Sequence, residues 1–370
     1  MRAAMSKPDT TALTVRALRA VGVEVPMTYA LGTSRATIAR APLLLIDLDT
    51  EEGVTGRAYL FCYLPAAASA IATMLDEVLA VTRGERVAPV DLWAKLAKRF
   101  ALIGVQGIVR MAMAGFDVAC WDALAQAAGL PLARLIGAQP ARIPAYNSCG
   151  LGLMPTDELA AEAEKLMAGG FKAVKLRLGY ATLREDLAAL AAVRSHVPAG
   201  THIMVDYNQA LSVAEALARG RALDREGVYW LEEPIRHDDY AGAARLAREL
   251  SVPIQIGENF SEPHGMAAAI AAGACDYVMP DLERIGGVTG WQRAAGLAAA
   301  HRIEMSSHLF PEVSAHLLAA TPTRHWLEWV DWAEAILQEP LRIEDGYAQA
   351  PERPGNGLSW NAKAVEKYRM

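Results

Sequence analysis

The sequence predicts an α/β protein in which a barrel of alternating strands and helices follows an N-terminal α+β domain. Strand signals and then helical patterns occupy the first part of the 370-residue chain, up to about residue 140. After Pro140, eight short apolar runs alternate with helical segments, which is the pattern of a (β/α) barrel. The chain is also longer than one ordinary domain, so two domains are expected.

Composition and charge restrict the classes of function. Apolar residues make up 53% of the chain, which is enough for a large core. The net charge of −6 and the lack of a long basic cluster argue against nucleic acid or an anionic membrane as a partner. No apolar run approaches the roughly 18 residues of a membrane span. Residues 1–11 lack the apolar core of a signal peptide, and four cysteines without a CxxC pair are typical of a reducing cytoplasm.

The first domain is expected to begin with a strand over residues 13–25, where valines partly alternate with other residues. Residues 26–41 lack a clear period and predict a loop. A hairpin signal at residues 50–53 separates strands expected over 42–49 and 53–63. Helical spacing then predicts three helices, over residues 66–81, 91–100 and 109–128.

The barrel strands are expected to be short and to alternate with helices. The predicted strands cover residues 142–148, 171–178, 202–206, 228–232, 254–258, 276–281, 303–308 and 325–330. The predicted helices cover residues 155–168, 183–196, 213–220, 240–249, 263–272, 290–301 and 311–320. We therefore divide the chain into a domain over 1–140, a barrel over 141–339 and a Pro- and Gly-rich segment over 340–370 that returns to the first domain.

Three of these strands end in an acid. Asp206, Glu232 and Glu258 lie 26 residues apart, twice over, which is about the length of one βαβ step. Because the carboxyl ends of barrel strands meet on one face, the three carboxylates should lie together and repel one another unless a cation is bound. Oxygen ligands without Cys or His favour Mg²⁺ first and Mn²⁺ second. The alternative is three unrelated acids that cap helices.

Other barrel strands also carry polar residues at or near their ends. Asp281 and His308 end the sixth and seventh strands, and Glu328 lies near the end of the eighth. Lys175 and Arg177 are two residues apart in the second strand, so both side chains are expected to point into the barrel. Two cations there need a neighbouring anion site, which the opposing acids or a carboxylate ligand supplies. Each residue alone also fits a structural role, such as a salt bridge, a core histidine or a loop cap.

At these residues the chain resembles the enolase superfamily, mandelate racemase subgroup, over nearly its whole length. The matching segments are Ile-Met-Val-Asp-Tyr-Asn-Gln (203–209), Glu-Glu-Pro (232–234), Gly-Glu-Asn (257–259), Met-Pro-Asp (279–281), Ile-Gly-Gly-Val-Thr-Gly-Trp (285–291), Met-Ser-Ser-His-Leu-Phe (305–310) and Ser-Ala-His-Leu-Leu-Ala-Ala-Thr-Pro-Thr (314–323). The resemblance implies an α+β capping domain over a (β/α)7β barrel of the TIM type. It also implies bound Mg²⁺ and abstraction of the α-proton from a carboxylate substrate.

The resemblance assigns roles to residues position by position. The three evenly spaced acids match the metal ligands, and Asp281 with His308 matches a general-base dyad. Glu328 matches the acid that donates a hydrogen bond to the developing enediolate. That role requires a protonated carboxyl group, which the neighbouring Trp326 and Trp329 are expected to favour by disfavouring the charged form.

The resemblance also assigns substrate-binding positions. Lys175 matches the first lysine of a Lys-x-Lys motif, where a cation holds the developing enediolate. Ser148 and Asn208 fall where polar groups of the substrate site are expected, although Asn208 alone also fits a turn. Residues 28–38 match a mobile flap over the substrate.

Two residues depart from the family pattern. Arg177 stands where the family motif has its second lysine, and arginine stays protonated, so a base for the second face of the substrate is in doubt. Arg35 lies in a flap that the resemblance implies to be apolar. It fits either a solvated surface arginine or a residue that binds a second anionic or hydroxylated end of the substrate.

These observations lead to one main hypothesis and two alternatives. The main hypothesis is a Mg²⁺-dependent, racemase-type isomerase that forms an enediolate from a 2-hydroxy carboxylate. An acid-sugar dehydratase of the same subgroup needs only His308 as its base and tolerates Arg177. A non-catalytic barrel that binds an acidic ligand or serves as an assembly subunit is disfavoured, because binding alone requires neither the metal ligands nor the dyad. A small carboxylate as partner, a homo-oligomer and a cytoplasmic location are expected.

Overall fold

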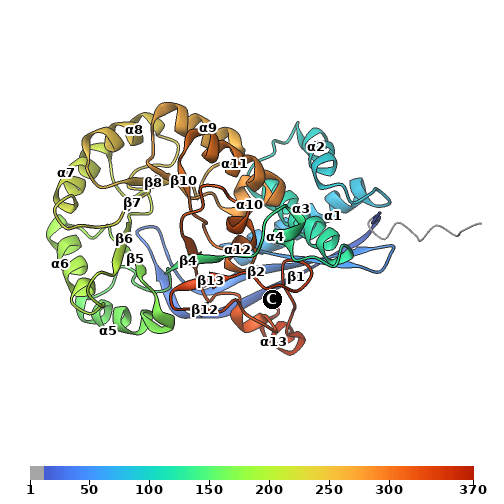
Figure 1. Ribbon diagram of the computed structural model, residues 1–370, viewed down its shortest axis with the longest axis horizontal. Coiled ribbons are helices and arrows are strands. Elements are labelled where there is room, and N and C mark those ends of the chain that lie inside the picture. Colours follow the sequence, from blue (N-terminus) through green and yellow to red (C-terminus); the bar gives the residue numbers. More distant parts are fainter. Residues whose placement is uncertain (1–11) are drawn as a thin grey trace, which may run out of the picture.

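The computed structural model of the protein describes residues 12–370, so the segment expected to lack a signal peptide, residues 1–11, lies outside the described residues. Figure 1 shows a ring of helices around short strands on one side of the molecule and the helices α1–α3 on the other. The long strands β1 and β2 run beneath both parts. The predicted fold class, a barrel with an N-terminal α+β domain, is confirmed.

The N-terminal part is an antiparallel sheet covered by helices. The sheet has the order β1 (Val15–Gly32), β2 (Thr37–Thr50) and β3 (Thr55–Phe61). Four helices follow: α1 (Pro65–Thr82), α2 (Pro89–Phe100), α3 (Gly107–Ala127) and α4 (Leu132–Leu135). The long helix α3 packs closely on β3. Glycine at position 56 permits this approach, because a Cβ atom there would collide with the carbonyl of Ala119.

The prediction of a loop over residues 26–41 is wrong for most of that range. β1 and β2 continue to pair through Pro26–Arg40, and after a bulge they pair again at Leu31–Ile38 and Gly32–Thr37. Much of this hairpin is exposed or only partly buried, so its side chains show no alternation of apolar and polar residues. Backbone pairing, which leaves no mark in the sequence, extends the strands here.

Helix α1 has the length and mean hydropathy of a candidate membrane span, and one third of the 18-residue stretch is buried. From the sequence we expected no apolar segment as long as a membrane span, whereas α1 meets that criterion by length and composition. Its buried residues include Ile71, Leu75 and Val78, which recur at helical spacing and pack on the core. Asp76 and Glu77 interrupt the apolar sequence. This is the pattern of a helix that covers a domain core.

Eight parallel strands form the barrel. They are β4 (Arg142–Asn147), β5 (Ala173–Arg177), β6 (His202–Asp206), β7 (Leu231–Glu232), β8 (Ile254–Ile256), β9 (Tyr277–Val278), β10 (Glu304–Met305) and β11 (Leu327–Trp329). Strands β4 to β10 are neighbours in chain order, and β11 pairs with β4. Hydrogen bonds from His325 N to Met305 O (2.9 Å) and from Ser307 N to Trp326 O (3.0 Å) join β10 to the last strand and close the barrel.

Helices connect these strands on the outside of the barrel. They are α5 (Thr156–Leu166), α6 (Leu183–Arg194), α7 (Val213–Leu223), α8 (Tyr240–Glu249), α9 (Glu262–Ala272), α10 (Leu282–Ile285), α11 (Gly287–His301) and α12 (Pro311–Ala319), with a short 3-10 turn, Ala168–Gly170, after α5. Helices α6 and α7 begin with capping boxes, Thr182 with Glu185 and Ser212 with Glu215.

The C-terminal segment contacts both parts of the chain. After a 3-10 turn (Glu334–Ile336) it forms β12 (Ile343–Glu344), β13 (Tyr347–Gln349) and α13 (Ala362–Tyr368), and β13 pairs antiparallel with β4 of the barrel. Trp360 Nε1 donates to Asp47 at 2.8 Å and Asn356 Nδ2 donates to the carbonyl of Arg57 at 2.8 Å. The segment therefore ties the barrel to the antiparallel sheet.

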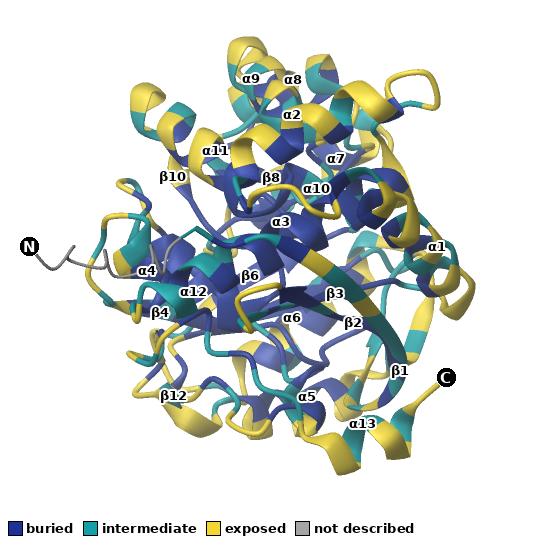
Figure 2. Ribbon diagram, turned by 90° about the vertical axis from the view of Figure 1, so that its right-hand side faces the viewer, coloured by how far each residue is buried: buried dark blue, intermediate teal, exposed yellow. Residues whose placement is uncertain are grey.

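The N-terminal domain is docked on the barrel through buried polar contacts. Figure 2 shows buried residues along β3 and α3, while the outer sides of helices such as α9 and α13 are exposed. Asp117 on α3 accepts the N–H of Thr289 at the start of α11 (2.9 Å). Tyr59 on β3 donates to Glu312 at 2.6 Å. These contacts hold the end of β3 over the carboxyl ends of the barrel strands.

Candidate active site

Three carboxylates meet at the carboxyl ends of β6, β7 and β8. Asp206 and Glu232 are the last residues of their strands, and Glu258 follows the end of β8 by two residues. One oxygen from each carboxylate lies within 4.8 Å of the others. Two of the acids are buried and Glu258 is partly buried. The structure thus brings the evenly spaced acids together, as consecutive parallel strands require.

Lys175 lies among these acids. From β5, its Nζ approaches Glu232 Oε1 at 2.8 Å and Asp206 Oδ2 at 3.5 Å. The same Nζ lies 2.7 Å from Glu328 Oε1. Burial acts to lower the pKa of Lys175, but these carboxylates outweigh burial and raise the pKa above its ordinary value. Lys175 is therefore protonated and neutralises part of the negative charge of the acid cluster.

One lysine does not neutralise the whole cluster. Burial raises the pKa of Glu232 to about 8 although Lys175 acts in the opposite direction, and the neighbouring carboxylates add to the rise. Burial also raises the pKa of Asp206, with Glu258 contributing. A further cation at the cluster would favour the ionised forms of Asp206 and Glu232. Three carboxylate oxygens without nitrogen or sulfur are a donor set that fits Mg²⁺.

His308 and Asp281 form a hydrogen-bonded pair beside the acids. Nδ1 of His308 lies 2.7 Å from Asp281 Oδ2, and its Nε2 lies 3.3 Å from Glu258 Oε2. The other oxygen of Asp281 caps α10 and accepts the backbone N–H groups of Glu283 (2.8 Å) and Arg284 (3.1 Å). Asp281 is fixed by these bonds, and it directs Nε2 of His308 toward the acid cluster.

Glu328 is held by donors on both of its oxygens. Oε1 accepts the hydroxyl of Ser148 at 2.7 Å and the ammonium of Lys175, while Oε2 accepts the N–H of Leu309 at 2.8 Å. Burial acts to raise the pKa of Glu328, but Lys175 and His308 outweigh burial and lower the pKa to about 2. Glu328 is therefore ionised in this structure.

The prediction that Trp326 and Trp329 keep Glu328 protonated is wrong for this state. Trp329 packs against Phe171, with ring centroids 5.4 Å apart. Trp326 packs against Tyr229 at 5.9 Å, within an aromatic cluster of the barrel interior. The charge of the carboxyl group is decided by the cations that touch it and not by residues adjacent in sequence.

Arg177 is buried and held by neutral acceptors. Its Nη1 donates to the carbonyl of Gly150 at 2.8 Å, and its Nη2 donates to the hydroxyl of Ser148 at 3.1 Å. Since Ser148 donates in turn to Glu328, the guanidinium orients this hydroxyl. Arginine at this position keeps its charge more firmly than the lysine of the family motif does.

Asn208 and Arg35 both line the pocket and are held there by protein partners. The backbone N–H and side-chain amide of Asn208 donate to Asp206 at 2.7 and 2.9 Å. Its Oδ1 is buried and has no partner among the described residues, so this oxygen can accept a bond from a ligand. Arg35 also lines the pocket, and its guanidinium donates to the carbonyls of Asn208 (3.2 Å) and Gln209 (2.5 Å).

Two family descriptions match the two parts of the chain. "Mandelate racemase / muconate lactonizing enzyme, N-terminal domain" matches residues 15–137, and "Enolase C-terminal domain-like" matches residues 158–364. The chain belongs to the mandelate racemase/muconate lactonizing enzyme family of the enolase superfamily. The barrel fold and the three acids clustered at its strand ends are the features that this family assignment predicts.

Solved members of the family share the fold and bind magnesium. An enolase from alpha proteobacterium BAL199 with bound magnesium is 45% identical and has a TM-score of 0.95, over 97% of this chain and 100% of that one. An enolase from Bradyrhizobium, complexed with magnesium and mandelic acid, is 40% identical and has a TM-score of 0.93, over 99% and 100% of the two chains. The present protein is a Mg²⁺-dependent enzyme of this superfamily.

Curated relatives in the family act on other substrates. The 3,6-anhydro-alpha-L-galactonate cycloisomerase of Streptomyces coelicolor is 32% identical over 85% of this chain and 88% of its own. The L-talarate/galactarate dehydratase of Salmonella typhimurium is 30% identical over 88% of this chain and 82% of its own. Membership of the mandelate racemase/muconate lactonizing enzyme family therefore leaves the reaction and the substrate to be inferred from the site.

From the sequence we expected an apolar flap over the site but did not identify the aromatic residues beside it. A pocket of about 180 Å³ lies over the acids, and its larger apolar residues are Leu31, Ile38, Phe61, Tyr63, Leu309 and Trp332. The ring of Phe61 lies 4.4 Å from that of Tyr63 and 4.8 Å from that of Trp332. Most of these residues belong to the N-terminal domain, so they join the site only when that domain docks. No pattern around Phe61, Tyr63 or Trp332 in the sequence indicates that these residues reach the site.

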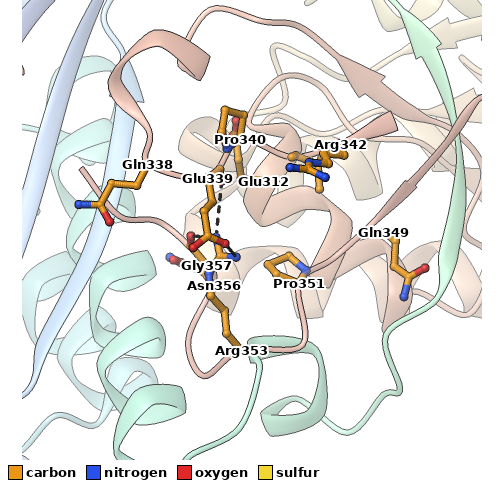
Figure 3. Close-up of a pocket in the computed structure, with 11 residues that line it drawn as sticks. Glu312, Gln338, Glu339, Pro340, Arg342, Gln349, Pro351, Arg353, Asn356 and Gly357 are labelled. Carbon is orange, nitrogen blue, oxygen red and sulfur yellow. Dashed lines mark hydrogen bonds and ion pairs between the residues drawn. The ribbon is translucent and has the colours of Figure 1, made fainter. Parts of the chain in front are cut away.

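A larger pocket of about 360 Å³ lies between the start of α12 and the C-terminal segment (Figure 3). Two of its charged groups already have protein partners. Arg353 lies 2.6 Å from Glu339, and Glu312 accepts the hydroxyl of Tyr59 at 2.6 Å. None of the residues expected at the active site lines this pocket. The smaller pocket at the barrel mouth is therefore the candidate active site.

Proposed function

We propose that this enzyme removes the α-proton of a 2-hydroxy carboxylate, with Asp206, Glu232 and Glu258 as the ligands of Mg²⁺. One observation carries the proposal. His308, anchored by Asp281, directs Nε2 to within 3.3 Å of Glu258, so an oriented imidazole lines one small pocket together with Asp206 and Glu258, and Glu232 lies beside these two acids. Base and metal ligands in this arrangement suit abstraction of a proton next to a carboxylate.

The metal, when bound, supplies positive charge that stabilises the developing enediolate. Nε2 of His308 accepts the α-proton, and Asp281 stabilises the resulting imidazolium through Nδ1–H. Lys175 provides a second cation for the substrate carboxylate. Glu328 faces the same region and donates a hydrogen bond only after it gains a proton. A substrate carboxylate that draws Lys175 away removes part of the charge that now keeps Glu328 ionised.

The protonation state of His308 depends on the acids around it. Burial acts to lower its pKa, but Glu258 and Glu328 outweigh burial and raise the pKa well above the ordinary value. Positive charge bound at Glu258 opposes this rise. We therefore expect His308 to be a competent neutral base only in the Mg²⁺-loaded enzyme.

The arrangement of Arg177 supports abstraction from one face of the substrate. Racemisation needs a proton acceptor on each face, and the position of the second family lysine is occupied by a guanidinium bound to Gly150 and Ser148. Lowering the pKa of arginine from near 13 to about 8 would cost roughly 7 kcal/mol. We therefore propose isomerase-type proton exchange in which one enantiomer reacts much faster than the other.

The apolar lining supports a substrate with an apolar group on its α-carbon. Phe61, Trp332 and Leu309 line the pocket together with apolar residues of the flap. They offer few hydrogen-bond partners to a polyhydroxylated chain, and hydroxyl groups buried there would remain unpaired. The related Bradyrhizobium enolase is complexed with mandelic acid, an aryl 2-hydroxy acid, which agrees with this choice.

An acid-sugar dehydratase is the second candidate, and Arg177 favours it. One group, His308, can remove the α-proton and then, as an acid, assist departure of the 3-hydroxyl, so a second base is not needed. Relatives that include the Salmonella typhimurium L-talarate/galactarate dehydratase have this type of activity by name. The polar side of the pocket, with Asn208 and Arg177, would then bind the sugar hydroxyls.

The test is to incubate each mandelate enantiomer separately with enzyme and Mg²⁺ in D₂O and to follow the α-proton by NMR. The proposal expects exchange from one enantiomer, with the hydroxy acid retained. A parallel panel of acid sugars is assayed for 2-keto acid. Turnover of an acid sugar without exchange of any aryl hydroxy acid would replace the proposal by the dehydratase. Equal exchange from both enantiomers would show a second base.

A further inference from the structure

The tip of the β1–β2 hairpin is an ordered turn. Strand pairing runs to Gly32 and Thr37, and within the turn Thr33 N donates to Ala36 O at 2.9 Å. The hydroxyl of Thr33 accepts the N–H groups of Arg35 and Ala36, both at 3.1 Å. We call residues 33–36 the flap tip. Its backbone geometry is set by these bonds, so the side chains of Ser34 and Arg35 project from a defined turn.

The flap tip is bound to the turn that follows β6, residues 207–209. Ser34 Oγ donates to the carbonyl of Tyr207 at 3.2 Å. Arg35 Nε donates to the carbonyl of Asn208 at 3.2 Å and Arg35 Nη2 to that of Gln209 at 2.5 Å. Three consecutive carbonyls of the barrel therefore accept bonds from two consecutive residues of the flap tip.

The conformation of the 207–209 turn explains why its carbonyls are available. Asn208 and Gln209 have φ values of 45° and 63°, in the left-handed region. Their N–H groups are used inside the barrel, by Asp206 Oδ1 at 2.7 Å and by the carbonyl of Glu233 at 2.7 Å. The N–H groups bind barrel residues and the carbonyls bind the flap. A cationic donor such as Arg35 is a suitable partner for such carbonyls.

Asn208 connects the flap to a proposed metal ligand. Its backbone N–H and its side-chain amide hold both oxygens of Asp206, while its carbonyl accepts Arg35. A change in the position of Asn208 therefore affects Asp206 and the flap together. We propose that Arg35 is a positioning residue that latches the flap over the pocket, and that flap closure and Mg²⁺ binding stabilise each other through Asn208.

The hydrogen bonds of Arg35 are weak enough for the flap tip to open. Arg35 is exposed, so water competes for its hydrogen bonds, and its partners are neutral carbonyls. Gly32, the residue before the flap tip, is held differently, since its carbonyl accepts the N–H of Leu153 at 3.2 Å and a Cβ at Gly152 would collide with Gly32. Loss of Arg35 should therefore release the flap tip while the rest of the hairpin stays paired.

The test measures amide hydrogen exchange in residues 30–38 and uses Mg²⁺ alone as the ligand. Arg35→Ala is compared with Arg40→Ala, an arginine of the same hairpin that pairs with Glu24 (3.0 Å) away from the pocket. Arg35→Ala should accelerate exchange at the flap tip by roughly tenfold, because it removes two charge-assisted bonds that water partly replaces. Arg40→Ala should leave exchange at the flap tip unchanged.

Coupling to the metal is tested with the same proteins. Saturating Mg²⁺ should slow exchange at the flap tip of the natural protein, and by reciprocity Arg35→Ala should weaken Mg²⁺ binding, roughly fivefold by calorimetry. Flap exchange that does not change in Arg35→Ala would overturn the latch. Flap exchange that does not respond to Mg²⁺ would overturn the coupling. Neither measurement depends on the substrate or on the proposed reaction.

Discussion

Replacing Asp281 by asparagine should separate the two functions of this side chain. One carboxylate oxygen caps α10 by accepting the N–H groups of Glu283 and Arg284, and the other accepts Nδ1–H of His308 at 2.7 Å. Asparagine keeps one oxygen and presents an NH₂ group in place of the second. The question is which partner loses its acceptor.

The energies favour the orientation that keeps the helix cap. Turning the amide oxygen toward His308 would leave the two N–H groups of Glu283 and Arg284 without an acceptor, at about 1–3 kcal/mol for each buried group. Leaving it at the cap loses only the charge-assisted bond that the carboxylate accepts from Nδ1–H of His308. The NH₂ group then faces Nδ1, which must act as an acceptor, so the proton moves to Nε2. A protonated Nε2 cannot remove the α-proton, and exchange should fall roughly 10²–10⁴-fold.

The assay combines α-proton exchange in D₂O with urea unfolding. Asp281→Asn should lose exchange while its free energy of unfolding falls by little more than about 1 kcal/mol. Asp281→Ala is the matched control, because it loses the acceptor for His308 and also the cap, at about 0.5–2 kcal/mol more. Exchange in Asp281→Asn within a factor of about three of the natural rate would refute this assignment of the base.

Three other predictions follow from the site and the domain interface. Chelation should abolish exchange, and added Mg²⁺ at 100 times its Kd should raise the free energy of unfolding by about 2.7 kcal/mol, measured in urea; full activity in EDTA would exclude a catalytic Mg²⁺. Arg177→Lys should create exchange from the second mandelate enantiomer, and an unchanged preference by NMR would contradict the role given to residue 177. Burial raises the pKa of Asp117 to about 7, so the folded protein keeps a proton that the unfolded chain releases near pH 4. The free energy of unfolding should therefore decrease as the pH rises from about 4 to 7. In urea unfolding, the contribution of Asp117 to this decrease should be missing in Asp117→Asn. If the free energies of unfolding of both proteins changed with pH in parallel, the raised pKa of Asp117 would be refuted.

The barrel could be predicted because acidic residues recur in the sequence at the length of one strand-helix step. Each strand-helix step returns the chain to the same face, so the even spacing of Asp206, Glu232 and Glu258 carried spatial information. Strand lengths carried less, and the sixth strand, expected over residues 276–281, is regular only over Tyr277–Val278. Its terminal residue, Asp281, still lies beside His308 because an isolated parallel bridge joins the two.

Other parts of the site depend on contacts that a linear pattern does not encode. The flap was expected, but its strand conformation was missed because the hairpin is held by backbone pairs and most of its side chains are exposed or partly exposed. The apolar lining was missed because Phe61 reaches the pocket through docking of β3 on the barrel. The charge of Glu328 was predicted wrongly because it depends on Lys175 at 2.7 Å, a residue 153 positions earlier in the chain.

The two arginines that depart from the family pattern share one physical property. Within residues 12–370, no carboxylate oxygen lies within 4.0 Å of the guanidinium of Arg35 or Arg177, and both groups are bound by neutral oxygens. Their charges are therefore not cancelled locally, and both residues line the pocket. An enediolate carries more negative charge than its parent carboxylate, so such charge favours the intermediate over the substrate. Arg177 thus supplies permanent positive charge at a position where lysine would supply a removable proton. For this reason the natural protein and Arg177→Lys should differ in the stereochemistry of exchange but share the same dependence on Mg²⁺.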